Sequence, residues 1–292
     1  MTAWRRTWVA IAIATVGLVQ AGAAPQPRQT PMFSVRVDSV SLDVSVTRNR
    51  EPVLNLTTSD FELFDNGVAQ QIDSIGFDEV PVNVMLALDM SGSVQGTRLE
   101  QLRRAATAIF QGLAPGDSGG LLGFSERVVV RSGFTADREL LTNALRQPVP
   151  GGDTALYDAV YTAMVLGDDE AGRPLVIVFS DGADTASFLS PALVLDAARR
   201  LRPAVYAVTS PGVRDDLLND LVRATGGRRL DVASLDRLSE TFAAVLAESR
   251  QRYLIGFTPQ GVEPTGWHEL TVRVRGRSDV VISARPGYIA GP

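Results

Sequence analysis

The sequence predicts an α/β protein: a mostly parallel six-stranded sheet with helices on both faces, plus a β-rich accessory domain made from the two ends of the chain. From Asn83 to about Arg250, short apolar runs alternate with amphipathic helical patterns. Residues 33–78 and 252–289 instead show the short alternating patterns of strands. Neither of these outer segments has enough strands to be stable alone, so we expect them to pair with each other.

The amino-terminal residues resemble a targeting segment. Arg5 and Arg6 precede the apolar run 8–19, and small residues follow at Ala21-Gly22-Ala23. This order predicts a signal peptide over 1–23, cleaved after Ala23, and an exported protein that is periplasmic or secreted. The run is too short to favour a permanent span, although an uncleaved anchor is the alternative. We expect no transmembrane span after signal removal.

The amino-terminal β region is predicted over 33–78, after a flexible lead-in at 24–32 that contains prolines and glutamines. Apolar and polar residues alternate through 34–46, as in a strand with one buried face. Asn66-Gly67 then lies between two short strand-like runs, which is a strong hairpin signal.

The α/β domain is predicted over 82–250. Its strands are expected near 82–89, 119–125, 127–133, 174–180, 204–209 and 228–231. Its helices are expected near 97–113, 137–146, 155–166, 190–201, 214–225 and 235–250. The second and third strands are joined too tightly for a crossover helix, so one of them must run antiparallel at an edge. Beyond this domain, strands are expected at 253–257, 268–275 and 279–284.

The composition excludes several classes of function. The formal net charge is −5 and would become −7 after signal removal, because residues 1–23 hold two arginines and no acid. Such a chain has no electrostatic basis for binding nucleic acid or anionic lipid. It has no cysteine and no lysine, which excludes thiolate nucleophiles, Schiff bases and P-loops. A Ser-His-Asp triad would need His268, the single histidine, in a strand-like segment where a structural role is expected.

Oxygen-bearing side chains follow two of the predicted strands and precede one predicted helix. Asp89, Ser91 and Ser93 follow the first strand, Asp181 follows the strand 174–180, and Thr154 precedes the helix 155–166. The carboxyl ends of parallel strands meet at one sheet edge, so these oxygens can converge there. Hard cations such as Mg²⁺ prefer such ligands.

With these residues in this order, the sequence resembles the von Willebrand factor type A (VWA) domain and its metal-ion-dependent adhesion site. The resemblance implies a metal site for Mg²⁺ (or Mn²⁺), held by Asp89, Ser91, Ser93, Thr154 and Asp181, with some contacts made through water. It also implies a Rossmann-like sheet. The segments 60–67 and 284–288 further resemble a group of bacterial exported VWA-related proteins.

The predicted function is binding of partner proteins rather than catalysis, and no catalytic residue is assigned. Only two of the five predicted ligands are charged, and in the family one or more contacts run through water, which leaves the metal under-neutralised with a position facing solvent. We therefore expect an Asp or Glu of a protein ligand to complete the coordination. The alternatives are a metal-dependent hydrolase and a metal-free structural scaffold of an envelope assembly. Against a hydrolase, the Asp89 loop lacks a second acid two residues on, and no general base accompanies it.

Three neighbouring acids have open interpretations. Asp184 follows Asp181 closely and could be an outer partner of the metal site or a turn-capping residue. Asp153 and Asp158 bracket Thr154 and could orient its loop, or they could lie on the solvated surface or cap a helix.

Overall fold

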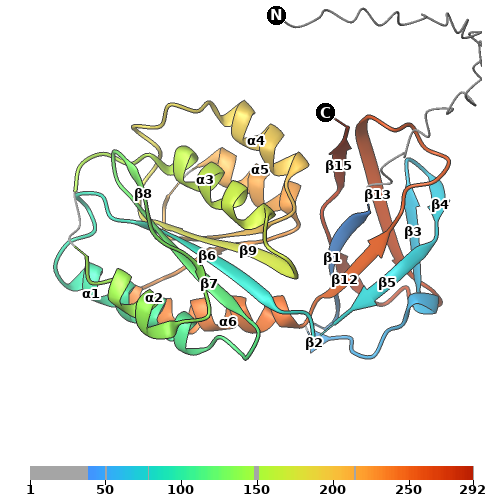
Figure 1. The fold of residues 1–292 in the computed structure, drawn as a ribbon, viewed down its shortest axis with the longest axis horizontal. Coiled ribbons are helices and arrows are strands. Elements are labelled where there is room, and N and C mark those ends of the chain that lie inside the picture. The colour runs from blue at the N-terminus through green and yellow to red at the C-terminus, as the bar shows by residue number, and fades with distance from the viewer. Residues whose placement is uncertain (1–38, 50, 78, 148–150, 214, 292) are drawn as a thin grey trace, which may run out of the picture. The chain divides into compact units, whose positions relative to one another are not determined.

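A mixed six-stranded sheet lies at the centre of the α/β domain, with strand order β11-β10-β9-β6-β7-β8 (Figure 1). Its strands are β6 (Val82–Asp89), β7 (Ser118–Phe124), β8 (Val128–Thr135), β9 (Arg173–Ser180), β10 (Ala204–Thr209) and β11 (Arg229–Asp231). All neighbouring pairs are parallel except β7 and β8. The antiparallel edge strand predicted from the tight connection is therefore β8.

Helices cover both faces of this sheet. They are α1 (Thr97–Gln111), α2 (Arg138–Ala144), α3 (Leu156–Asp168), α4 (Pro191–Arg200), α5 (Asp216–Thr225) and α6 (Leu238–Arg250). Helices α1, α2 and α6 pack over one face, and α3, α4 and α5 over the other (Figure 1). Every residue of β6 and β9 is buried, because both strands lie inside the sheet and helices cover both of its faces. The predicted fold class is confirmed.

The computed structural model describes residues 39–291 except 50, 78, 148–150 and 214. The predicted signal peptide (1–23), the lead-in (24–32) and the first residues of the amino-terminal β region lie outside the described residues. In the part of the chain that is described, no helix is long and apolar enough to cross a bilayer.

The β-rich part consists of two sheets that both combine strands from the two ends of the chain. One has the order β14-β1-β12-β5, with β2 also paired to β1, and the other has the order β15-β13-β3-β4. The amino-terminal strands are β1 (Val40–Arg48), β2 (Glu51–Pro52), β3 (Phe61–Asp65), β4 (Val68–Gln70) and β5 (Ile72–Gly76). The carboxyl-terminal strands are β12 (Tyr253–Phe257), β13 (Gly266–Val274), β14 (Val281–Ser283) and β15 (Gly287–Ala290). Their apolar faces share one core.

Strand β15 was not among the strands predicted from the sequence, because Arg285-Pro286-Gly287 reads as a turn. It pairs with β13 through Glu269 and Gly287. A β-carbon at Gly287 would lie 2.2 Å from the carbonyl oxygen of His268, so only glycine allows this close approach.

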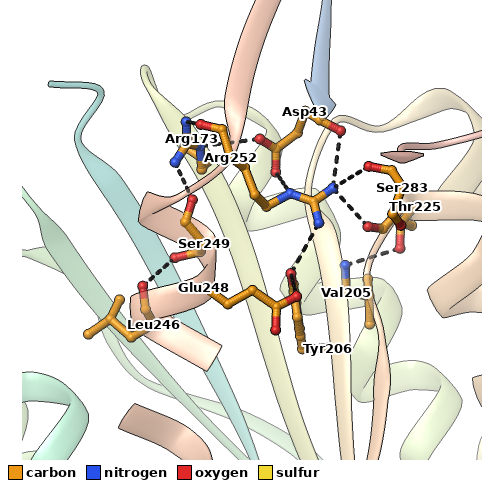
Figure 2. Close-up of polar contacts among 11 residues, drawn as sticks. Asp43, Arg173, Val205, Tyr206, Thr225, Leu246, Glu248, Ser249, Arg252 and Ser283 are labelled. Carbon is orange, nitrogen blue, oxygen red and sulfur yellow. Dashed lines mark hydrogen bonds and ion pairs between the residues drawn. The ribbon is translucent and has the colours of Figure 1, made fainter. Parts of the chain in front are cut away.

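A buried polar junction connects the β-rich part to the α/β domain (Figure 2). Arg252, which follows α6 and precedes β12, forms an ion pair with Asp43 of β1 (Nε to Oδ2, 2.8 Å). Its guanidinium also donates to the carbonyl oxygens of Asp43 and Gly226. Burial acts to lower the pKa of Arg252. The carboxylate of Asp43, together with Tyr206 and Glu248, outweighs this effect, so the pKa of Arg252 is raised.

Arg173, the first residue of β9, approaches the same carboxylate from the other side (Figure 2). Its Nε lies 3.3 Å from Oδ1 of Asp43. It also donates to the carbonyl oxygens of Ser249, in α6, and Arg252. Two buried guanidinium groups therefore share one carboxylate, and β1, β9 and the end of α6 meet at this junction.

Candidate metal centre

Asp89 is the last residue of β6 and is fully buried. Strands β6 and β9 are in parallel register with Leu88 opposite Phe179, so Asp89 lies beside Ser180, the last residue of β9. The Ser180 hydroxyl donates to Oδ2 of Asp89 at 2.7 Å, and the Ser91 backbone N–H donates to Oδ1 at 2.9 Å. The carboxylate is therefore fixed at the carboxyl edge of the sheet.

The environment of Asp89 is unfavourable for a negative charge. Burial raises its pKa, the hydrogen bonds from Ser91 and Ser180 act in the opposite direction, and the negative charge of Asp181 raises the pKa further. The groups that donate to Asp89 are neutral. A cation placed here would compensate a charge that these donors stabilise only in part.

A continuous series of hydrogen bonds runs from the Asp89 loop to the loop after β9. The hydroxyl oxygens of Ser91 and Ser93 lie 3.0 Å apart, and the Ser93 hydroxyl donates to Oδ1 of Asp181 at 2.6 Å. The structure therefore brings together four of the five residues predicted to bind metal: Asp89, Ser91, Ser93 and Asp181. Their oxygens come from two adjacent strand ends, as the sequence pattern predicts.

Backbone contacts hold the loop of Thr154 against this group. The Gly92 N–H donates to the Gly152 carbonyl oxygen at 3.0 Å. The carbonyl oxygen of Thr154 accepts from the N–H groups of Thr185 and Ala186, which follow Asp181 in the chain. Gly152 has a φ of +103°, a conformation that favours glycine. Thr154 thus lies in a loop fixed on both sides by the loops that carry the other predicted ligands.

The nearby acids Asp158 and Asp184 organise backbone rather than point to the Asp89 group. Asp184 accepts from the Tyr157 N–H at 3.2 Å and also from the Ser187 hydroxyl. Asp158 accepts from the N–H groups of Phe188 and Leu189. These backbone partners lie 27 to 31 residues away in the chain, so the two carboxylates join the segment after β9 to the start of α3 rather than cap local turns.

One member of the site was not predicted from the sequence. Arg98, in the first turn of α1, forms an ion pair with Asp181 (Nη1 to Oδ2, 3.2 Å). An arginine in the first turn of a helix carries no local signal for this contact, since Asp181 is 83 residues away.

The donor set suits a hard cation. The five predicted ligands would offer two carboxylates, three hydroxyls and no nitrogen or sulfur, which is the chemistry that Mg²⁺ and Mn²⁺ accept. Within the described ranges, no group of three or more His, Cys, Asp or Glu side chains could hold a metal. A metal centre here would therefore depend on hydroxyls and water as well as on Asp89 and Asp181.

Residues 84–183 match the family profile described as von Willebrand factor type A domain. The chain contains a VWA domain. The matched range begins in β6 and ends just after Asp181, so all five predicted ligands fall inside it.

The curated proteins that are similar to this chain are distant in sequence. A UPF0353 protein of Mycolicibacterium paratuberculosis is 24% identical over 222 residues, which are 64% of this chain and 64% of that protein. Human inter-alpha-trypsin inhibitor heavy chain H6 is 26% identical over 246 residues, 73% of this chain and 19% of that protein. The chain thus spans less than two thirds of the length of these relatives.

Solved structures with the same fold include a von Willebrand factor type A protein from Catenulispora acidiphila. It has a TM-score of 0.54 and 14% identity, and the match covers 89% of this chain and 74% of that one. Proximal thread matrix protein 1 from the mussel byssus, solved with a zinc-occupied MIDAS motif, has a TM-score of 0.53 and 17% identity, covering 62% and 48% of the two chains. At these identities the likeness shows the VWA fold.

His268 lies in the β-rich part, in a buried cluster with Asp65 and Tyr288. Its Nδ1 is 2.8 Å from Oδ1 of Asp65, and the Tyr288 hydroxyl donates to Oδ2 of the same carboxylate at 2.9 Å. Within the described residues, Nε2 is buried without a hydrogen-bond partner, so no serine hydroxyl stands where a triad would need one. The structural role expected for this histidine agrees with these contacts.

We expect His268→Ala to lower the free energy of unfolding by about 1–3 kcal/mol, because Asp65 would lose a buried hydrogen-bond partner. Binding of Mg²⁺ should be unchanged, since His268 contacts none of the predicted ligands. Urea unfolding and calorimetric metal titration measure the two quantities. Loss of metal binding in a folded His268→Ala protein would contradict the assignment of His268 to the β-rich core.

Proposed function

We propose that this protein is an exported binding module whose VWA domain holds a divalent cation, Mg²⁺ or Mn²⁺, and uses it to bind a partner protein. Asp89, Ser91, Ser93, Thr154 and Asp181 would hold the ion, directly or through water. The observation that carries this proposal is Asp89, a fully buried carboxylate whose hydrogen-bond donors are neutral and which is linked through Ser91 and Ser93 to Asp181.

When bound, the ion would supply an electrophilic position for an additional oxygen ligand. Only Asp89 and Asp181 bring formal charge to it, so a carboxylate from an Asp or Glu of another protein is the ligand that such a position favours. The side chains of this chain would orient the site, because β6 and β9 fix Asp89 and Ser180 in register. No residue of the site is assigned a catalytic role.

A metal-free scaffold is the competing proposal that an experiment separates most directly. In that case, Ser91 and Ser93 would serve only the hydrogen-bonded turn after β6. The carboxylate Asp89 would then remain buried with neutral donors, which is energetically unfavourable and has no compensating function.

The test is a calorimetric titration of the protein with Mg²⁺ and Mn²⁺. Wild type should show saturable binding, whereas Asp89→Ala should show none, because the variant lacks the central carboxylate. A partner that depends on the ion should also be lost from Asp89→Ala. Retained partner affinity in this variant would contradict binding through the metal.

Asp117→Asn is the matched control. Asp117 is also a buried carboxylate of the same domain, but it immediately precedes β7 and accepts from the Val82 and Ala114 N–H groups. It therefore lies at the opposite edge of the sheet from Asp89. Asp117→Asn should be destabilised yet still bind metal, which separates loss of the site from general loss of stability.

A further inference from the structure

The ion pair between Arg98 and Asp181 places a positive charge on one of the two carboxylates proposed to hold the metal. Nη1 of Arg98 lies 3.2 Å from Oδ2 of Asp181, while Oδ1 of the same carboxylate accepts from Ser93. Both oxygens of Asp181 are therefore engaged, one by a hydroxyl and one by a guanidinium. The Asp181 side chain is only 4% exposed, so its charge is shielded from water and depends on such partners.

Arg98 itself is not buried, and its side chain is 57% exposed. Nη1 makes one further contact, at 3.5 Å, with the carbonyl oxygen of Ser93. A guanidinium held by one charged partner and one long hydrogen bond can leave the carboxylate at little cost, because water can solvate it where it is.

The position of Arg98 in the helix does not explain its pairing. It lies in the first turn of α1, where the helix dipole disfavours a positive charge, and the helix begins at Gly96 without a side-chain cap. The favourable contact of Arg98 in this region is therefore its interaction with Asp181, not with the helix.

From these contacts, and resting on the metal site proposed above, we propose that Arg98 is an internal cation that competes with the divalent metal for Asp181. In the metal-free protein, the guanidinium neutralises Asp181 and holds the loops of Ser93 and Asp181 together. Metal binding requires the guanidinium to leave Oδ2, and the exposed Arg98 side chain then turns to solvent. Arg98 thereby sets the metal affinity without being a ligand.

The test compares Mn²⁺ binding by wild type, Arg98→Gln and Arg98→Lys, with free Mn²⁺ measured by electron paramagnetic resonance. Arg98→Gln removes the competing charge and should bind Mn²⁺ about two- to fivefold more tightly, the range expected for loss of a half-exposed ion pair. Arg98→Lys keeps the charge and should remain close to wild type.

Arg104→Gln is the matched control, since Arg104 is an exposed arginine of the same helix and its replacement changes the net charge equally. It should leave the affinity unchanged. If Arg98→Gln and Arg104→Gln bind Mn²⁺ as wild type does, Arg98 does not compete, and only this inference fails. If no variant and no wild-type protein binds Mn²⁺, the metal site itself is refuted and the inference with it.

Stability without metal provides a second readout. Arg98→Gln should unfold at a slightly lower temperature than Arg104→Gln in the absence of metal, and its midpoint should rise more when Mn²⁺ is added. A purely structural role for Arg98 would lower the midpoint equally with and without Mn²⁺, and that result would overturn the competition.

Discussion

Replacing Asp43 with alanine should destabilise the protein by about 3–5 kcal/mol, the cost of removing one partner from a buried ion pair. Asp43 is the carboxylate that the buried guanidinium groups of Arg173 and Arg252 share (Figure 2). The variant would leave both cations with backbone carbonyl partners but without their common counter-charge. Urea unfolding followed by circular dichroism measures the change in free energy.

Asp279→Ala is the control for this prediction. Asp279 also pairs with an arginine of β1, Arg48, but both side chains are about half exposed. Removing such a surface pair should cost less than about 1 kcal/mol. Equal stability of the two variants would show that the junction carries no more energy than a surface ion pair.

Acidification should begin to weaken metal binding at pH values that lie above the ordinary pKa of an aspartate side chain. Burial raises the pKa of Asp89, so this carboxyl keeps its proton at a pH where an exposed aspartate has lost it. A protonated carboxyl cannot serve as a ligand, and metal affinity should fall by up to about tenfold per pH unit below this raised pKa. Mn²⁺ titrations between about pH 5 and pH 7.5 measure the effect.

Ionisation of Asp89 strengthens metal binding as the pH rises, but it lowers the stability of the metal-free protein. Between the pKa of the unfolded chain and the raised pKa of the folded protein, the folded state binds more protons. The contribution of Asp89 to stability is therefore complete at low pH and is lost as the pH rises through the raised value. Added metal should reverse this trend, since it stabilises the ionised form.

Ser180→Ala sharpens the pH test. The Ser180 hydroxyl donates to Asp89 and thereby lowers its pKa. Without this hydrogen bond, the pKa should rise further and the loss of affinity should begin at a higher pH than in wild type. A pH-independent affinity in protein that stays folded would contradict the participation of Asp89.

Most of the VWA domain was predictable because its signals are local. The strands β6 and β9 contain the continuous apolar runs 84–88 and 174–179, and the helices between them repeat apolar residues at helical spacing. All six strands and six helices of this domain occur within a few residues of their predicted positions. The predicted helix 235–250 begins with a short 3₁₀ turn (Leu235–Arg237), and α6 follows it. The spacing of apolar residues does not distinguish a 3₁₀ turn from the first turn of an α-helix.

The convergence of Asp89, Ser91, Ser93 and Asp181 was also predictable, because parallel strands place their carboxyl ends at one edge. The role of each as a metal ligand stays a prediction. Arg98 was not predicted, since its partner is fixed only when β6 and β9 become neighbours. The role of Asp43 was not predicted either. Its alternation with Leu42 and Val44 indicates a polar residue on the outer face of a strand, and not a carboxylate that pairs with two buried arginines.

By itself, the sequence determined most of the segments that form strands and helices, although not β15, and it determined the oxygen-rich loops at the carboxyl edge of the parallel sheet. These depend on periodicity and on residues close in the chain. Only the tertiary structure decided that β1 lies between β14 and β12, that β13 lies between β15 and β3, and that one carboxylate serves Arg173 and Arg252. Contacts between residues some 200 positions apart leave no local periodic signal, and they are fixed only when the two ends of the chain bury their apolar faces in one core.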